Sequence, residues 1–369
     1  MADRLLVGTR KGLFILEREG GEWQVAARQF MGVEVPMVLQ DPRTGTIHAA
    51  VKHGHFGTKL HRSTDGGRSF TEGAAPAYPP KPEGVEDIDP FRKQPVPWSV
   101  QLLWSLEAGH TSQPGRLWAG TIPGGLFRSD DDGASWTLVR SLWDHPDRKR
   151  WAGGGYDFAG IHSISVHPED GRKVAVAVSV GGVWRTEDDG ETWRCEYTGM
   201  RADYAPPEHA GDPVGQDPHR VVRCAAVPDV LWCQHHNGIF RSTDGGDTWT
   251  ELQGGLPSTF GFAMAAHPTD PETAWVVPAI KDEQRLPKDG RVIVARTRDG
   301  GKSFEVLTEG LPQEDAYDLV YRHALDVDGA GQSLAFGSTT GSLWVSDDQG
   351  DAFRCLNAHL PPIYCVRFG

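Results

Sequence analysis

The sequence predicts an all-β protein folded as a seven-bladed β-propeller, and three observations carry this prediction. A segment of the form Ser/Thr-x-Asp-x-Gly-x-x-Trp/Phe occurs six times, beginning at Ser63, Ser129, Thr186, Ser242, Thr297 and Ser346. Its aspartates, Asp65, Asp131, Asp188, Asp244, Asp299 and Asp348, follow one another at intervals of 49 to 66 residues, the period of a propeller blade with insertions. The 45 glycines and 26 prolines suit many short strands joined by turns.

The segment Ser242–Trp249 explains why the repeat marks a β-hairpin turn. The carboxylate of Asp244 can accept hydrogen bonds from backbone N–H groups, and the hydroxyl of Ser242 can hold the entering strand. Gly246 supplies a position of positive φ. Trp249 begins the next strand and is large enough to fill the space between two packed sheets.

This repeat resembles the Asp-box (bacterial neuraminidase, or BNR) repeat of sialidase-like β-propellers, and the resemblance extends over nearly the whole chain. In that family the boxes lie on outer hairpins between the third and fourth strands of each blade, away from the face that binds ligand. The resemblance therefore implies that the six aspartates are structural. It specifies the fold strongly and the reaction hardly at all.

The number of expected strands predicts how the ring closes. Residues 1–31 contain three expected strands and lack the innermost one, whereas residues 361–369 form a single strand with nothing after it. We expect this last strand to complete blade 1, because closure removes exposed sheet edges. Residues 1–369 then form one domain, in which residues 32–360 supply blades 2 to 7, with four strands in each blade.

Four long connections are expected on one face of the ring: residues 74–97, 141–159, 196–219 and 279–291. Each either joins consecutive blades or links the second and third strands of a blade, and these positions open on the same side of a propeller. Loops longer than about 12–15 residues in a compact domain are usually functional. We therefore expect the ligand site at the mouth of the central channel on this face.

The composition of the chain limits the kinds of partner and the cellular compartment that we expect. The net charge of −13 makes nucleic acid and anionic membrane poor partners. The sequence shows no run of 18 apolar residues and no signal-peptide pattern, so we expect a cytoplasmic protein. The five cysteines fit reduced thiols better than a disulfide framework.

Six histidines are expected at the ligand face, at places where other blades have no equivalent: His53, His55, His162, His219, His235 and His236. Imidazole is both the commonest metal ligand and the usual acid or base near neutral pH. They could hold a divalent metal ion with Glu34 or Asp157. They could instead form a metal-free site in which His162 or His219 works as acid or base beside the same carboxylates. Hydrogen-bonded surface histidines are the third alternative.

Further residues at this face are candidates for contact with substrate: Arg10, Lys11, Trp98, Tyr156, Arg220 and Asn237. Aromatic rings there could stack on sugar rings, and the alternative for each is that it packs a long loop onto the ring.

Three functions fit these features. The first is a hydrolase or lyase, similar to glycosidases, acting on a carbohydrate-like or small polar substrate. The second is a metal-dependent enzyme that uses the histidines, and the third is a scaffold that binds a protein partner. Sialidase activity is not expected: the first arginine of those enzymes lies in a Phe/Tyr-Arg-x-Pro motif, and this chain has Gly8-Thr9-Arg10-Lys11-Gly12 there.

Overall fold

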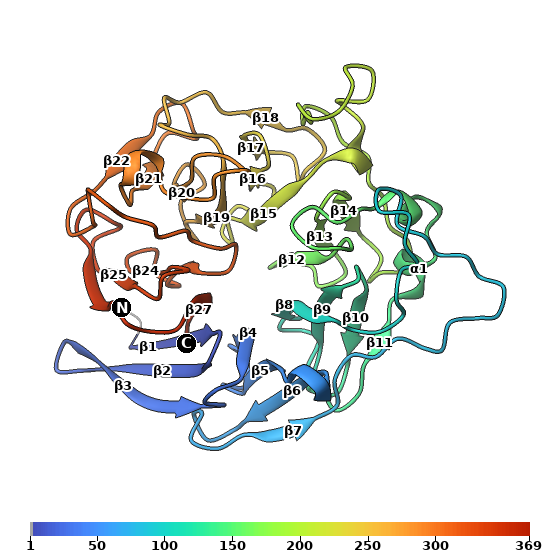
Figure 1. Ribbon diagram of the computed structural model, residues 1–369, viewed down its shortest axis with the longest axis horizontal. Coiled ribbons are helices and arrows are strands. Elements are labelled where there is room, and N and C mark those ends of the chain that lie inside the picture. Colours follow the sequence, from blue (N-terminus) through green and yellow to red (C-terminus); the bar gives the residue numbers. More distant parts are fainter. Residues whose placement is uncertain (1–2) are drawn as a thin grey trace.

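The computed structural model describes residues 3–369 and shows seven antiparallel sheets arranged in a ring around one axis (Figure 1). From the innermost strand outward, the first four blades contain β27 (Ile363–Phe368), β1 (Arg4–Thr9), β2 (Gly12–Glu19) and β3 (Glu22–Gln29); β4 (Glu34–Gln40), β5 (Ile47–Lys52), β6 (Thr58–Ser63) and β7 (Thr71–Gly73); β8 (Leu102–Ala108), β9 (Leu117–Ile122), β10 (Leu126–Ser129) and β11 (Thr137–Leu138); and β12 (Ile161–Val166), β13 (Val174–Val178) and β14 (Gly182–Thr186). The last three contain β15 (Pro218–Arg223), β16 (Leu231–His235), β17 (Ile239–Ser242) and β18 (Thr250–Glu251); β19 (Gly261–Ala266), β20 (Ala274–Pro278), β21 (Val294–Thr297) and β22 (Glu305–Leu307); and β23 (Leu325–Val327), β24 (Leu334–Gly337), β25 (Leu343–Ser346) and β26 (Arg354–Asn357).

Helix is almost absent from the described residues, as the sequence predicts. It is confined to one α-helical turn and four short 3₁₀ segments: α1 (Arg140–Trp143), η1 (Gly54–Phe56), η2 (Pro146–Arg150), η3 (Pro213–Gly215) and η4 (Lys288–Gly290). Within residues 3–369, no helix has the length and apolar character needed to cross a membrane.

The C-terminal strand closes the ring, which confirms the prediction. β27 pairs antiparallel with β1, with Val366 opposite Val7, so the last and first strands lie side by side in blade 1 (Figure 1). The side chains of Ile363 and Val366 are completely buried. Closure therefore rests on apolar packing as well as on the backbone ladder.

Blade 4 departs from the expected four strands. Its sheet has three, and the fourth segment contributes only a bridge in which Arg185 and Arg194 exchange two backbone hydrogen bonds of 2.9 Å. Beyond this bridge, Tyr197 packs over the start of β14. Its hydroxyl donates to the carbonyl of Pro213 at 2.8 Å and accepts from the Val183 N–H at 3.3 Å.

The six repeat turns are built as the sequence predicts. In the fourth copy, Ser242 Oγ donates to Asp244 Oδ1 at 2.8 Å and accepts from the Gly246 N–H at 2.9 Å, with φ of 97° at this glycine. The N–H and hydroxyl of Thr248 then donate to the two carboxylate oxygens at 2.9 and 2.6 Å. Only the last copy lacks this second hydroxyl, because Ala352 stands at that place.

Large aromatic side chains fill the spaces between blades. Five tryptophans are among the largest fully buried side chains: Trp118, Trp184, Trp232, Trp275 and Trp344. The aromatic residues of the repeat turns fill these spaces only in part. Trp193, Trp249 and Phe353 are buried, but the other three are half-buried.

Candidate functional site

A β-bulge recurs near the start of six of the seven inner strands. In β8, Leu103 and Ser105 pair with the consecutive residues Thr121 and Gly120, so Trp104 is an extra residue. The same irregularity singles out one residue in each of four other strands: Tyr364, His162, His219 and Phe262. In β4 it leaves Val35 and Pro36 opposite the single residue Val51, and we count Pro36 because it lines the pocket described below. A bulge re-aims a side chain that strict alternation would place elsewhere. We call these six the bulge residues.

The bulge residues come together across the ring. The guanidinium of Arg322, which precedes β23 of blade 7, lies 4.9 Å from the rings of both Trp104 and Phe262. His162 lies against Trp104, with ring centroids 5.3 Å apart, and His219 stacks on Phe262 at 4.6 Å. Side chains from blades 3 to 7 therefore meet near the axis of the ring. Four of them come from the inner strands β8, β12, β15 and β19, which surround this axis (Figure 1).

A pocket of about 190 Å³ adjoins this group of side chains, and Trp104 and Arg322 are part of its wall. Aromatic and ionisable side chains dominate its walls: Trp104, Tyr156, Tyr321, Tyr364, Glu34, Arg285, Arg322 and His323. We call this the channel-mouth pocket. It lies on the face where the long connections predicted a ligand site, and residues 155 and 156 come from one of those connections.

Arg322 is the unusual residue of this pocket. Its side chain is only 8% exposed, yet it forms no ion pair with any described residue, and its Nε has no hydrogen-bond partner. Burial lowers its pKa to about 10, partly opposed by the charge of Asp217, so it remains a cation at neutral pH. A buried charge without a paired counter-ion is unfavourable unless something else supplies one.

Other polar groups around the pocket are also unpaired. His323 Nδ1 accepts from Arg220 at 3.1 Å, so its Nε2 carries the hydrogen, and this buried N–H has no acceptor. His162 Nε2 is likewise buried without a partner. The hydroxyls of Tyr156 and Tyr321 form no hydrogen bond with another described residue. The pocket therefore offers a cation and several free polar groups to one ligand.

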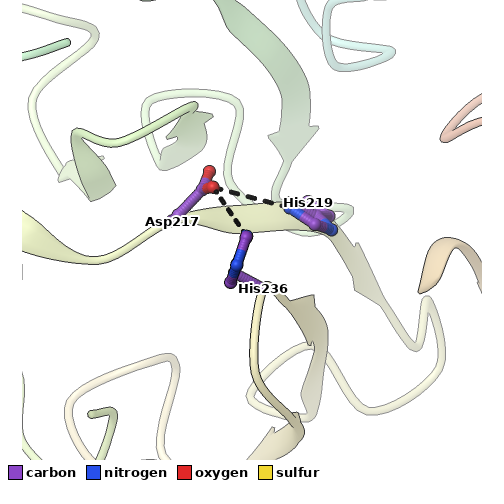
Figure 2. A group of neighbouring side chains, drawn as sticks. All are labelled: Asp217, His219 and His236. Carbon is purple, nitrogen blue, oxygen red and sulfur yellow. Dashed lines mark ion pairs between the residues drawn. The ribbon is translucent and has the colours of Figure 1, made fainter. Parts of the chain in front are cut away.

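A second group of polar side chains lies beside the pocket and consists of Asp217, His219 and His236. Asp217 precedes β15, His219 is in β15, and His236 follows β16; the three side chains point toward one another (Figure 2). Asp217 Oδ2 lies 3.5 Å from His219 Nε2 and 3.4 Å from His236 Nδ1. We call this group the Asp217 cluster.

Charges around the Asp217 cluster keep its carboxylate ionised. Burial alone would raise the pKa of Asp217, but His219, His236 and Arg322 hold it well below its usual range. The neighbouring carboxylate of Asp217 raises the pKa of His236, whereas burial lowers that of His219. Carboxylate and imidazole groups in this arrangement could hold a metal ion or transfer a proton.

Some residues proposed from sequence lie at these two places. Glu34 and Tyr156 line the channel-mouth pocket, and His162 lies behind Trp104. Asp157 is adjacent to Tyr156 in sequence but is exposed and forms an ion pair with Arg92 at 3.2 Å. Of the six histidines, only His219 and His236 enter the Asp217 cluster.

The remaining histidines lie elsewhere or have structural partners. His53 and His55 belong to the exposed loop around η1, and the ring of His53 faces Phe56 of the same loop. Within the described residues, neither histidine belongs to a group of three side chains close enough to share a metal ion. His235 is buried, and its Nε2 accepts the Asp217 N–H at 3.1 Å.

The other proposed contact residues hold loops or lie deeper. Trp98 Nε1 donates to Asp87 at 3.1 Å, within the long insertion after blade 2. Asn237 binds the backbone of residues 201 and 203, and Arg220 is buried against His323. Arg10 and Lys11 are exposed in the turn between β1 and β2, outside the channel-mouth pocket.

Sequence reasoning did not select Asp217, Arg322, Trp104 or Tyr364 as site residues. Asp217 and Arg322 each stand just before an inner strand, and that position was the available signal. Trp104 and Tyr364 lie inside strands and reach the channel mouth through bulges, which leave no recognisable mark in the sequence.

Comparisons with known proteins support the fold. No family model matches the chain. A xyloglucanase of Hypocrea jecorina (strain QM6a) is 28% identical over 158 residues, which are 39% of this chain and 17% of that protein. This chain therefore spans less than a fifth of its curated relative.

Solved structures of glycoside hydrolase family GH74 share the architecture. The xyloglucanase from Xanthomonas campestris has a TM-score of 0.66 and 17% identity, over 97% of this chain and 53% of that one. An ancestral GH74 enzyme has a TM-score of 0.60 and 15% identity, over 87% of this chain and 38% of that one. The chain is thus a seven-bladed β-propeller similar to GH74 xyloglucanase propellers.

Proposed function

We propose that the channel-mouth pocket binds a carbohydrate-like substrate that carries an anionic group, and that the protein cleaves this substrate. The observation that carries the proposal is Arg322, a buried cation that forms no ion pair within residues 3–369 and lies in the floor of an aromatic pocket. A carboxylate on the substrate would supply the missing counter-ion. The rings of Trp104, Tyr156 and Tyr364 offer apolar faces to a sugar.

The pocket walls favour a lyase. Glu34 is the only carboxylate among the described lining residues, whereas glycosidases generally use two carboxyl groups about 5–9.5 Å apart. A β-elimination needs one base and one cation. Glu34 takes the proton from the carbon next to the substrate carboxylate, while Arg322 stabilises the negative charge that develops on that group.

The elimination is balanced without any further reactant. The electron pair of the broken C–H bond forms a carbon–carbon double bond, and the bond to the neighbouring glycosidic oxygen breaks. The departing oxygen takes a proton from a tyrosine hydroxyl or from water. Hydrolysis of a glycosidic bond is the second candidate, and the similarity to GH74 xyloglucanases favours it.

The test uses uronate-containing oligosaccharides and neutral xyloglucan oligosaccharides with the purified full chain. We expect binding and cleavage of the acidic substrates. Elimination gives an ultraviolet-absorbing unsaturated product with unchanged total mass, whereas hydrolysis adds one water per cleavage.

Variants identify the residues responsible. Arg322→Met should weaken binding of the acidic ligand by at least about 100-fold, because a charge-assisted pair is lost in a buried site. Glu34→Gln should retain binding and lose cleavage. Lys302→Met is the matched control, since this lysine is exposed in a repeat turn. Equal binding of acidic and neutral ligands, or full binding by Arg322→Met, would refute the proposal.

A further inference from the structure

The separations within the Asp217 cluster do not suit direct hydrogen bonds. Asp217 Oδ2 is 3.5 Å from His219 Nε2 and 3.4 Å from His236 Nδ1 (Figure 2). Hydrogen bonds between such charged partners are about 2.7–2.9 Å long. Two ligand atoms that each lie about 2.1 Å from a tetrahedral ion are about 3.4 Å apart. These two separations match two edges of a coordination polyhedron, and all three ligand atoms lie within 4.8 Å of one another.

The tautomer of His219 leads to the same conclusion. Its Nδ1 lies 2.7 Å from the carbonyl oxygen of Gly261, so Nδ1 carries the hydrogen and donates it. With Nδ1 held by the backbone, Nε2 is the ring nitrogen that faces Asp217 Oδ2 and is left to contact an ion. A backbone carbonyl that holds the far nitrogen is also the usual support of a metal-bound histidine.

The backbone holds the cluster rigidly. Asp217 Oδ1 accepts the Val180 N–H at 3.1 Å, which leaves Oδ2 for the cluster. The carbonyl of Asp217 accepts the His236 N–H at 3.0 Å, and His235 accepts the Asp217 N–H. Ligand atoms fixed in this way lose little freedom when an ion binds.

We propose that Asp217, His219 and His236 bind one divalent transition-metal ion, such as Zn²⁺ or Mn²⁺. Two imidazoles and one carboxylate suit these ions, and three protein ligands leave at least one position open for water or substrate. His236 is the half-buried member, so solvent reaches the ion from its side. His219 stacks on Phe262, which separates the ion from Arg322 and the channel-mouth pocket.

The test measures metal binding itself and does not depend on any enzymatic activity. The full chain, freed of metal with a chelator, is titrated separately with Zn²⁺, Mn²⁺ and Co²⁺ by calorimetry, and Co²⁺ is also followed by visible absorption. We expect one ion per chain with a Kd below about 1 μM for at least one of these ions. Bound Co²⁺ should give the ligand-field bands of a site with nitrogen and oxygen ligands.

Variants then locate the ion. His236→Ala and Asp217→Asn should each weaken binding by more than about 10-fold. Asparagine keeps an oxygen that can accept the Val180 N–H, so this variant tests the charge with little change to the fold. The double variant His53→Ala/His55→Ala, in the exposed loop of blade 2, should bind as the wild type does.

Three results would overturn this inference. The first is the absence of stoichiometric binding for all three ions by the folded wild-type chain. The second is binding that survives both His236→Ala and Asp217→Asn. The third is loss of binding in the His53/His55 double variant alone, which would place the ion in the blade 2 loop.

Discussion

Replacing Arg322 by Met separates the role of this residue in binding from its role in stability. Burial lowers its pKa from 12.5 to about 10, and at 1.36 kcal/mol per unit this destabilises the charged form by roughly 3 kcal/mol. Contacts with the faces of Trp104 and Phe262 stabilise the charged form by about 1–4 kcal/mol in total. Because the two contributions nearly cancel, Arg322→Met should change the free energy of unfolding by less than about 2 kcal/mol.

Arg367→Met is the matched comparison. Arg367 lies in β27 and forms an ion pair with Glu107 at 2.7 Å, with side chains 15% and 24% exposed. Its removal leaves Glu107 without its partner. A fully buried pair would lose about 3–5 kcal/mol, and partial exposure reduces this to about 2–4 kcal/mol.

Urea unfolding followed by tryptophan fluorescence compares the wild type and the two variants, and titration with an acidic oligosaccharide measures binding. We expect Arg322→Met to keep nearly all of its stability and to lose binding. Arg367→Met should unfold at clearly lower urea. If Arg322→Met lost as much stability as Arg367→Met, Arg322 would be a structural residue and the argument for an anionic ligand would fail.

Three further predictions concern the ring and its turns. Deletion of residues 361–369 removes the buried side chains of Ile363 and Val366, each worth about 1.5–3 kcal/mol, together with the inner ladder of blade 1. The truncated chain should be insoluble or melt far below the wild type, and an unchanged melting temperature would refute closure by β27. Asp244→Ala removes the acceptor for the N–H and hydroxyl of Thr248, and because water can replace it in this exposed turn, the loss should be about 1 kcal/mol. Ligand titration should show unchanged binding, and lost binding with wild-type stability would contradict a structural role. Hydrogen bonds from Thr248 outweigh burial and lower the pKa of Asp244 from 3.8 to about 2. The folded pKa is therefore below the unfolded one, so this stabilisation is complete above about pH 4 and disappears as the pH falls toward 2. Melting temperatures of the wild type and Asp244→Ala should converge over that interval, and a constant difference down to pH 2 would contradict this origin.

Local sequence determined the blades of this protein. The hydrogen bonds of the Ser/Thr and Asp side chains in a repeat turn join residues at most four positions apart, as between Asp244 and Thr248, so the repeat contains the residues that shape its turn. The missing inner strand at one end and the extra strand at the other likewise predicted closure, because an open sheet edge is unfavourable. The repeat did not predict the three-stranded sheet of blade 4, in which the side chain of Tyr197 and not a backbone ladder holds the outer segment.

Part of the site followed from position in the repeat. Glu34 begins an inner strand, and Tyr156 lies on a long connection. His219 lies near the start of an inner strand, and His236 follows the next strand of the same blade. All four positions open on the face of the ring where the sequence predicts a ligand site. The same reasoning also selected His53, which directly follows β5 as His236 directly follows β16. Its side chain faces its own loop, and the orientation of a loop side chain is decided by packing.

Only the tertiary structure decided which side chains meet at the axis. Trp104 and Phe262 belong to blades 3 and 6, and Arg322 to blade 7, so their contact exists only once the ring has closed. The bulges in the inner strands also decide which side chains meet there, because one extra residue changes which side chain faces the channel. A bulge arises from the register between two strands, and no single strand carries that information. The same holds for the Asp217 cluster, in which the register of β15 on β16 sets Asp217 beside His236.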